Sequence, residues 1–425
     1  MPGKLKDAYC KYCMKFIDLF AGLGGFHVGL TALGHQCVFA CELDAGLQTV
    51  YQKNFGIMPA GDLREVNNTE IPSHDILCAG FPCQPFSKAG SQSGFNCARN
   101  GTLFDEVARI VDHHRPEFVI LENVPNLRRH NNGRTWQIIY DRLKELGYET
   151  DASQYSPHQF GIPQIRQRIL IVARRKSLQT FEWPERPENP KPSLRSILDD
   201  KPSDAKALSK QVENCLETWQ EFLDRIPRNE ALPSWPIWSM EFGATYPFEG
   251  TTPHAIRPVE LRNYRGSHGV KLSVGTFPDP FVGLPSHGRT PQEQVPLWKQ
   301  HFVWTNRAFY QKHKSRLADW MPKILAFPLS LQKFEWNCQG EARDLWKLVI
   351  QFLVSGVRVK RPDTSPSFEA MATTQVHVIG WERLYMTTRE YARLHSLDGL
   401  IHRPGTDTNS FTAMGNKSTI SQCAA

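Results

Sequence analysis

The sequence predicts an α/β protein with a doubly wound, mostly parallel sheet and a second domain of irregular structure. The chain has 425 residues, which is more than one ordinary domain contains. Over residues 15–175, short apolar runs alternate with helical patterns, as in a parallel sheet covered by helices. Over residues 176–355 the periodicity is weak, and this stretch holds nine of the 11 tryptophans. We therefore expect a first domain over 15–175, completed by 356–425, and a second domain over 176–355.

The elements of the first domain follow from the spacing of its apolar residues. Five apolar runs have the length of strands, and stretches with apolar residues at helical spacing lie between them. A proline-rich stretch, 184–202, follows this domain. Near the C-terminus, Thr387 and Glu390 form a predicted capping box that begins a helix over 387–396. The strands are expected at 15–20, 37–43, 75–79, 118–121 and 168–172, and the helices at 44–54, 103–114 and 135–146.

The charge distribution indicates a polyanionic partner. The chain carries 50 basic and 43 acidic residues, a net charge of +7. Residues 257–323 hold 11 of the Lys and Arg residues and four of the Asp and Glu residues, so this segment accounts for the whole net charge. A local basic surplus is typical of nucleic-acid binding. The alternative is a solvated face without a partner.

Composition argues against a membrane protein, a secreted protein and a metal site. No run of about 18 apolar residues occurs, so no membrane span is expected. The basic N-terminus lacks the apolar stretch of a signal peptide, and ten scattered cysteines are typical of reduced thiols in the cytoplasm. Cys10 and Cys13 form a single CxxC pair with no second pair at zinc spacing, so no metal site is predicted.

A glycine-rich turn, DLFAGLGGF, follows the first predicted strand. Glycines in such a turn let the backbone approach a ligand at a helix N-terminus. The GxGxxG fingerprint of dinucleotide binding is absent. Glu42 ends the second strand about 20 residues later, where an acid accepts hydrogen bonds from ribose hydroxyls. The glycine-rich turn, together with Glu42 and the later Asp62, favours a nucleoside-containing cofactor. The alternative for each acid is that it caps a helix or is an exposed surface charge.

The third predicted strand runs directly into the sequence FPCQPFS. Cys83 therefore comes just past a buried strand, between Pro82 and Pro85, and a stretch rich in Gly, Ser and Asn follows. A thiolate at such a position is a candidate nucleophile. Cys78 lies inside the apolar strand and is expected in the core.

Charged groups are expected beside this cysteine. Glu122 ends the fourth strand and is a candidate acid or hydrogen-bond partner. Arg166 and Arg168 precede the last strand and point to the same side if that stretch is extended. Two guanidinium groups beside a Cys and a Glu suit an anionic or carbonyl-bearing substrate.

Together these motifs resemble the DNA (cytosine-5)-methyltransferase family. The motifs occur in the family's order and spacing over about 15–175 and 358–418, and the unmatched middle falls where the family carries its target recognition domain. The resemblance implies a Rossmann-like fold that uses S-adenosylmethionine and releases S-adenosylhomocysteine. The matching blocks are DLFAGLGG, the acid of CELD, GDL, GFPCQPFS, GTLF, LENV, GIPQIRQR, TTREYARL and the Met-Gly-Asn of 414–416.

The resemblance also implies a role for each matching residue. Cys83 would add to C6 of a flipped-out cytosine, Glu122 would contact N3, and Arg168 would hold O2 with Arg166 nearby. Glu42 would bind the ribose, Asp62 the adenine amino group and Phe20 the adenine face. Gln84 and Ser87 would lie on the loop that closes over DNA. The full set of implied cofactor positions is Phe20, Leu23, Gly24, Glu42, Asp62, Pro82, Leu103 and Asn416.

Two positions depart from the family pattern. Lys417-Ser418 follows Gly-Asn where the family usually has a small residue and Val before a full helix, and the sequence ends at Ala425. We therefore expect the last element to pack differently on the cofactor pocket. Leu43 replaces an aromatic residue often found after the acid, which loosens the expected adenine pocket.

The basic segment 257–323 is expected to contact DNA, with arginines reading guanine and lysines holding phosphate. The alternative is that its aromatic residues form the domain's own core. The candidate DNA-binding residues here are Arg307, Lys312, Lys314 and Arg316, interleaved with Trp298, Trp304, Phe309 and Tyr310.

The predicted protein is a bacterial enzyme that methylates cytosine in a specific double-stranded DNA sequence. We expect a monomer in the cytoplasm, associated with the nucleoid and acting beside a separate restriction endonuclease. One alternative is a transfer RNA cytosine-5 methyltransferase, although the large middle segment favours reading of duplex DNA. Another is a catalytically impaired DNA-binding homologue. A Rossmann oxidoreductase is disfavoured because the glycine pattern does not fit and Pro-Cys-Gln would have no role.

Overall fold

The protein folds into two compact units. The computed structural model describes residues 13–82, 103–188, 190–291, 294–367 and 375–416. Unit 1 comprises Met1–Pro202, Asp363–Thr373 and Thr387–Ala425. Unit 2 comprises Ser203–Pro362 and Thr374–Met386.

Unit 1 is built on a six-stranded sheet with the order β2-β1-β3-β4-β7-β5. The first four strands along the chain are parallel, whereas β7 runs antiparallel to both of its neighbours. The order reverses between β1 and β3, and parallel sheets bind ligands at the carboxyl ends of strands beside such a reversal. The strands are β1 (Lys15–Leu19), β2 (Gln36–Cys41), β3 (Ile76–Ala79), β4 (Phe118–Asn123), β5 (Glu149–Tyr155) and β7 (Arg168–Arg174).

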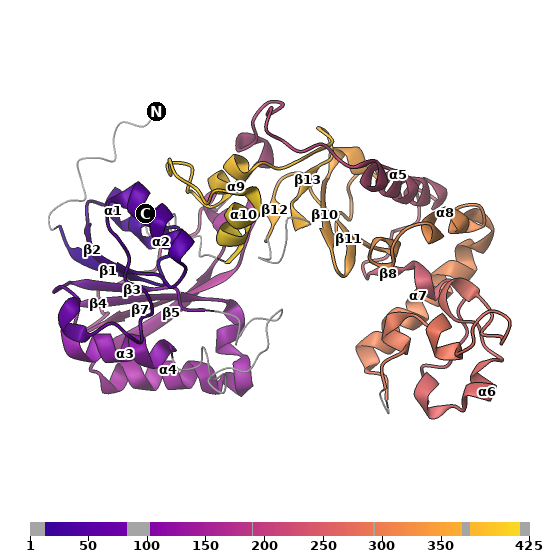
Figure 1. The fold of residues 1–425 in the computed structure, drawn as a ribbon, viewed down its shortest axis with the longest axis horizontal. Coiled ribbons are helices and arrows are strands. Elements are labelled where there is room, and N and C mark those ends of the chain that lie inside the picture. The colour runs from indigo at the N-terminus through magenta and orange to yellow at the C-terminus, as the bar shows by residue number, and fades with distance from the viewer. Residues whose placement is uncertain (1–12, 83–102, 189, 292–293, 368–374, 417–425) are drawn as a thin grey trace. The chain divides into compact units, whose positions relative to one another are not determined.

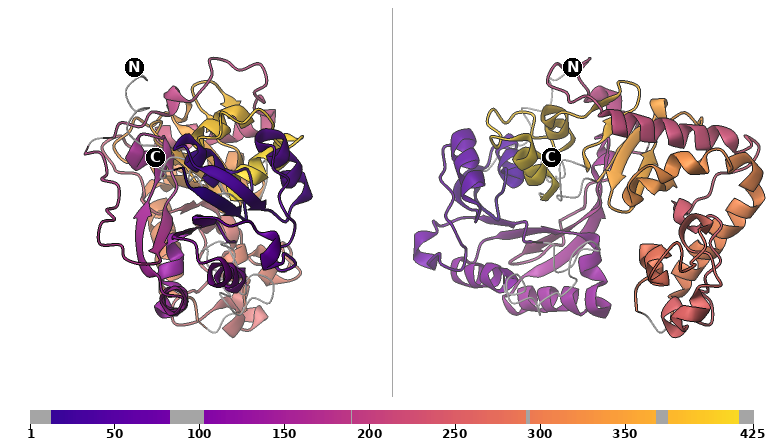
Figure 2. Two further views of the ribbon diagram at one scale, coloured as in Figure 1. Left: turned by 90° about the vertical axis from the view of Figure 1, so that its left-hand side faces the viewer. Right: turned by 45° about the vertical axis from the view of Figure 1, so that its right-hand side comes forward.

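Helices cover both faces of this sheet (Figures 1 and 2). Because successive strand residues point to opposite faces, Ile17 and Leu77 enter the core beneath α3 (Leu103–His114) and α4 (Arg134–Glu145). Phe16 and Cys78 enter the opposite core, where α1 (Gly25–Ala32) packs. The helix α2 (Ala45–Phe55) completes this second layer. The predicted doubly wound, mostly parallel α/β fold is therefore confirmed.

The C-terminal part of the chain completes unit 1. Strand β12 (Ser365–Pro366) pairs in parallel with β6 (Gln164–Ile165), and the helices α9 (Thr388–Leu394) and α10 (Asp407–Asn416) follow. Thr387 is the N-cap of α9: its side chain accepts from Glu390 N, while the Glu390 carboxylate accepts from Thr387 N. The predicted capping box is confirmed.

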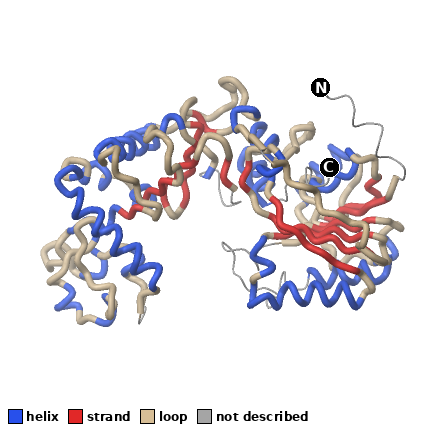
Figure 3. Tube along the Cα trace, turned by 180° about the vertical axis from the view of Figure 1, so that it is seen from behind, coloured by secondary structure: helices blue, strands red, loops and turns tan. Residues whose placement is uncertain are grey.

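Unit 2 combines a second sheet with helices (Figure 3). Its strand order is β14-β13-β10-β11-β9-β8. Aromatic residues fill its core, where Trp219 stacks on Phe334 with ring centroids 4.7 Å apart. The strands are β8 (Ile237–Trp238), β9 (Lys333–Trp336), β10 (Val349–Leu353), β11 (Gly356–Lys360), β13 (Val378–Ile379) and β14 (Leu384–Tyr385). The helices are α5 (Lys210–Arg225), α6 (Pro258–Leu261), α7 (Leu297–Leu317) and α8 (Met321–Leu325).

The predicted domain limits differ from those of the compact units. The stretch 176–202 belongs to unit 1 because Leu178 N and Trp183 Nε1 donate to acids of β5, at 2.8 Å each. The stretch 374–386 belongs to unit 2 because β13 pairs with β10. Irregular structure is concentrated in 242–291, while α5, α7 and the second sheet are regular elements that the weak periodicity did not predict.

Candidate active site

The turn after β1 is tight and conformationally strained. Phe20 and Gly22 have φ values of 59° and 60°, and Gly24 has a φ of 83° as the N-cap of α1. Positive φ is rare for an aromatic residue, and such strain concentrates at functional sites. A Cβ atom at Gly24 would lie 2.4 Å from the ring of Phe55, so only glycine fits here. Leu23 is buried in the same turn.

Glu42 closes this turn from the neighbouring strand. Strands β1 and β2 are parallel, so their carboxyl ends lie together, and Glu42 follows directly after β2. Its carboxylate accepts hydrogen bonds from Gly22 N at 2.7 Å and Asp44 N at 3.0 Å. Glu42 is buried and lines a cleft of about 590 Å³ with residues of α2 and of 402–413. The carboxylate is therefore held in one orientation at the edge predicted to bind a ligand.

A buried polar cluster packs against this turn, and the sequence analysis did not identify the cluster. His27 Nδ1 lies 2.7 Å from the Tyr51 hydroxyl, which donates to Asp18 at 3.5 Å. The His27 ring also stacks on Phe55 with centroids 3.9 Å apart. Burial lowers the pKa of His27 to about 4, so its ring is neutral near pH 7. No sequence signal identified this cluster, because its members come from three separate elements.

The other predicted cofactor residues lie at the same edge of the sheet or just beyond it. Asp62 accepts from Arg64, and these hydrogen bonds hold the pKa of Asp62 below its usual value. Leu103 is the buried first residue of α3, and Pro82 is half-buried three residues after β3. Leu43, the residue that departs from the family pattern, exposes 69% of its surface.

Glu122 and Arg168 form an ion pair. Their side chains come together because β7 runs antiparallel to β4, which places the start of β7 beside the end of β4. Arg168 Nε lies 2.7 Å from Glu122 Oε1, and the side chains of Glu122 and Arg168 expose only 6% and 18%. A largely desolvated carboxylate–guanidinium pair can hold a base edge by hydrogen bonds.

Arg166 points to a different part of unit 1. Its side chain is buried and donates to the Gly415 carbonyl at 2.9 Å and to Ser367 Oγ at 3.2 Å. Arg166 therefore ties β6 to the end of α10. Beside it, burial and then the charges of Arg166 and Arg168 hold the pKa of His395 well below its usual value.

The segment that follows Pro82 carries three of the predicted site residues. Cys83, Gln84 and Ser87 lie outside the described residues. Asn123, which the sequence analysis did not single out, donates from Nδ2 to the Phe81 carbonyl at 3.3 Å and so holds the chain just before Cys83. Asn416 is the last residue of α10. Within the described ranges no cluster of His, Cys, Asp and Glu could hold a metal ion, and no helix there is long and apolar enough to cross a membrane.

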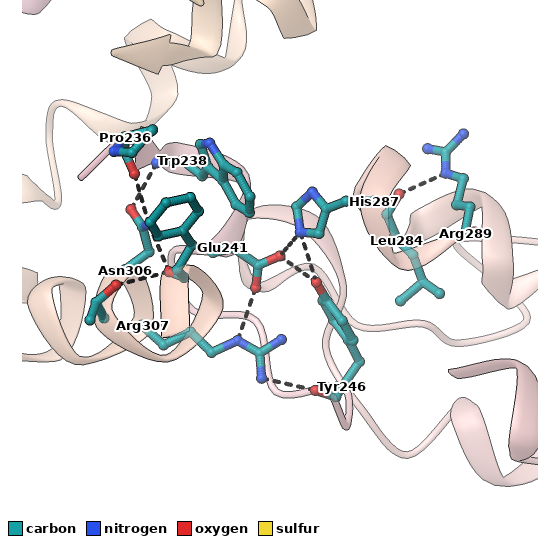
Figure 4. A network of polar contacts seen from close by, with 11 residues as sticks. Pro236, Trp238, Glu241, Tyr246, Leu284, His287, Arg289, Asn306 and Arg307 are labelled. Carbon is teal, nitrogen blue, oxygen red and sulfur yellow. Dashed lines mark hydrogen bonds and ion pairs between the residues drawn. The ribbon is translucent and has the colours of Figure 1, made fainter. Parts of the chain in front are cut away.

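In unit 2, Arg307 faces the interior (Figure 4). Its Nε lies 2.9 Å from the fully buried carboxylate of Glu241, and its Nη1 donates to the Tyr246 carbonyl at 2.8 Å. His287 Nε2 lies 2.6 Å from the same carboxylate, and the Tyr246 hydroxyl also donates to it. The expectation that Arg307 reads DNA therefore has to be corrected, because its guanidinium neutralises a buried acid.

The remaining basic residues of α7 are exposed. Lys312 pairs with Glu230 at 2.7 Å, whereas Lys314 and Arg316 form no ion pair within the described ranges. Some aromatic residues of α7 lie in the core of unit 2, and others lie at its surface. Phe309 is buried and Tyr310 stacks on Phe242, whereas Trp298 and Trp304 each expose 58% of their surface. The candidate residues of α7 therefore make up both a core and an exposed basic surface.

Comparisons with known proteins agree with these features. The family model of C-5 cytosine-specific DNA methylase matches residues 14–240. The chain is 47% identical to the Type II methyltransferase M.HhaI of Haemophilus parahaemolyticus over 174 residues, which cover 40% of this chain and 53% of that protein. It is 30% identical to the Type II methyltransferase M.AluI of Cellulosimicrobium cellulans over 458 aligned positions, which cover 92% of this chain and 86% of that protein.

A solved structure supports the same fold. A prophage protein of E. coli, assigned as a DNA modification methyltransferase, superposes with a TM-score of 0.52 at 17% identity and covers 97% of both chains. At this identity the likeness shows the fold alone. The family match and the alignment that spans most of the chain show that this protein belongs to the C-5 cytosine-specific DNA methylase family, and its enzyme class is that of the DNA cytosine-5 methyltransferases.

Proposed function

We propose that this chain transfers a methyl group from S-adenosylmethionine to C5 of a flipped-out cytosine in a specific double-stranded DNA sequence. The observation that carries the proposal is the Glu122–Arg168 pair, which lies at the carboxyl edge of the sheet where the chain leads into Cys83. The Type II methyltransferases M.HhaI and M.AluI are the relatives that support a DNA substrate.

The residues around the β1 turn fit a nucleoside-containing cofactor. The Glu42 carboxylate is fixed by two backbone N–H groups beside a strained glycine turn, as expected for an acceptor of ribose hydroxyls. We assign Glu42 to the ribose, Phe20 to the adenine face and Asp62 to the adenine amino group. Leu23, Gly24, Pro82, Leu103 and Asn416 would line the rest of the site, and S-adenosylhomocysteine would leave it as product.

The residues of the chain would activate the base by covalent addition. Cys83 Sγ, as a thiolate, forms a bond to C6, while Glu122 hydrogen-bonds N3 and stabilises its protonated form. Arg168 holds O2 and, through its pair with Glu122, orients the carboxyl group. The ring's electrons then make C5 nucleophilic, and the bound cofactor supplies the electrophilic methyl group. Loss of the C5 proton to a base breaks the S–C6 bond and restores the thiolate.

Arg166 would act without contacting the base. It holds the Gly415 carbonyl and, through it, would position Asn416 at the cofactor. A positioning role fits its burial better than direct contact with the substrate.

The substrate also requires movement of the base. A cytosine inside a duplex cannot reach Cys83, so the enzyme has to extrude it. Gln84 and Ser87, on the segment after Cys83, would contact the DNA. By analogy with Type II methyltransferases, we propose a bacterial cytoplasmic monomer that acts beside a separate restriction endonuclease.

The decisive experiment is covalent trapping on 5-fluorocytosine duplex DNA with S-adenosylmethionine. Fluorine at C5 cannot leave as a proton does, so the wild-type enzyme should form a stable adduct. Cys83→Ser should form none yet still bind duplex DNA, with Cys78→Ser as a matched control for loss of a thiol from the core. Adduct formation by Cys83→Ser would refute the assignment. Methyl transfer to transfer RNA in place of duplex DNA would establish the RNA alternative.

A further inference from the structure

Helix α7 exposes one continuous face along its whole length. With 21 residues it spans about 32 Å at 1.5 Å per residue. Six exposed residues recur at steps of three or four and therefore share one side of the helix. Leu297 and Trp304 on this side expose 82% and 58% of their surface. We call this side the outer face; it consists of Leu297, His301, Trp304, Ala308, Gln311 and Ser315.

Contacts on the opposite side fix the rotation of α7 (Figure 4). Asn306 Oδ1 accepts from Trp238 N at 2.7 Å, and its Nδ2 donates to the Pro236 carbonyl at 3.0 Å. One residue on, Arg307 pairs with the buried Glu241. Turning the helix would leave that carboxylate without its cation, and an uncompensated buried charge is costly. The outer face is therefore held towards solvent.

The charge of α7 is of one sign. Its sequence contains no acidic residue and five Lys or Arg residues. Glu241 and Glu230 neutralise Arg307 and Lys312, whereas Lys314 and Arg316 have no acidic partner in the described part of the chain. At 100° per residue, Lys314 lies along one edge of the outer face and Arg316 along the other. The outer face is thus a neutral strip with cations on both sides.

This distribution matches the major groove of a DNA duplex. The groove admits an α-helix, with phosphates along both of its rims and base edges at its floor. Ala308, in the middle of the outer face, lets the backbone approach closely. Gln311 can hydrogen-bond adenine on two atoms, Ser315 can bond to several bases, and Trp304 can contact a thymine methyl group. The flanking cations would hold the phosphates and set the register.

We propose that α7 is the DNA-recognition helix of this protein, with its outer face in the major groove and Gln311 and Trp304 as specificity-determining residues. The proposal rests on the proposed function and names the surface that selects the substrate. A second copy of the chain is a weaker candidate for this surface. In a two-fold contact between two such faces, the cations of one would approach those of the other.

The test adds a negative charge to the outer face. Ala308→Glu should weaken duplex binding about tenfold or more, because a carboxylate would face the base edges and phosphates. Val354→Glu is the matched control, since Val354 lies in the exposed turn between β10 and β11 of the same unit and the charge change is identical. Its dissociation constant should stay within about twofold of the wild-type value. Gln311→Ala should relax preference at one base pair when methylated sites are sequenced from a random duplex library.

The outcomes separate the inference from the proposed function. If the wild-type protein methylates duplex DNA but Ala308→Glu binds duplex DNA as tightly as Val354→Glu does, α7 is not the recognition helix. An unchanged site preference in Gln311→Ala would overturn the role of that side chain. If Ala308→Glu instead abolishes self-association and leaves DNA binding intact, the outer face belongs to a dimer contact. A wild-type protein that methylates no DNA would overturn the proposed function itself. The urea unfolding midpoint, followed by tryptophan fluorescence, checks that unit 2 of every variant is folded, because nine of the 11 tryptophans lie in this unit.

Discussion

Arg307→Met tests whether the charge cluster of unit 2 is a buried stabilising element or part of the DNA surface. The substitution keeps an apolar stem of similar length but leaves Glu241, which is fully buried, without its cation. Removing one partner of a buried ion pair costs about 3–5 kcal/mol. The Tyr246 hydroxyl and His287 would still contact the carboxylate, so we expect the lower end, about 3 kcal/mol.

This cost is measurable as a shift in urea unfolding. With a slope near 2 kcal/mol per M, the transition midpoint should fall by about 1.5 M. Tryptophan fluorescence is a suitable probe, because nine of the 11 tryptophans lie in unit 2. The thermal midpoint should fall by about 6–12 °C for a unit of this size.

The matched comparison is the double variant Arg307→Met with Glu241→Gln. It removes the stranded charge and should recover part of the lost stability, because replacing both partners of a buried pair costs less than removing one. If Arg307→Met leaves the urea midpoint unchanged but lowers the salt dependence of DNA binding, Arg307 faces DNA and its placement in the interior is wrong.

Four further outcomes are expected. Glu122→Gln should lower the single-turnover methylation rate by roughly 10²–10⁴-fold with little change in cofactor affinity, and a rate equal to wild type would exclude an acid role. Glu42→Ala should weaken S-adenosylmethionine binding about tenfold or more by calorimetry, since it removes a charged acceptor; unchanged affinity would make Glu42 a structural cap. Gly24→Ala should impair the same binding, because its Cβ would meet the Phe55 ring at φ 83°, and normal binding would contradict that packing. Burial alone would raise the pKa of Glu241, but His287 and Arg307 outweigh burial and hold this pKa below its usual value. Unit 2 should therefore lose stability as the pH falls through the lowered pKa. A urea midpoint that does not change with pH below pH 5 would argue against this prediction.

The sequence by itself determined the layout of unit 1 and the identity of most candidate site residues. Apolar runs of strand length predicted β1 and β4, and helical spacing predicted α3 with the bounds that the structure has. The capping box at Thr387 was also readable, because its two residues lie three apart. These features depend on short-range spacing, and the backbone converts such spacing directly into local structure. By contrast, the edge strand β5 is polar and half-exposed, so no apolar run marked it.

Only the tertiary structure decided which charged groups meet. Arg168 pairs with Glu122, 46 positions earlier in the chain, because β7 runs antiparallel to β4; Arg166, two residues away, reaches α10 instead. Likewise, Arg307 and Lys314 are seven residues apart and share one side of α7, but the segment that carries the buried Glu241 packs beside Arg307 and leaves Lys314 exposed. Sequence spacing gives the periodicity of an element but not its partners. Those depend on how elements pack, and a buried charge is stable only where packing supplies its counter-charge.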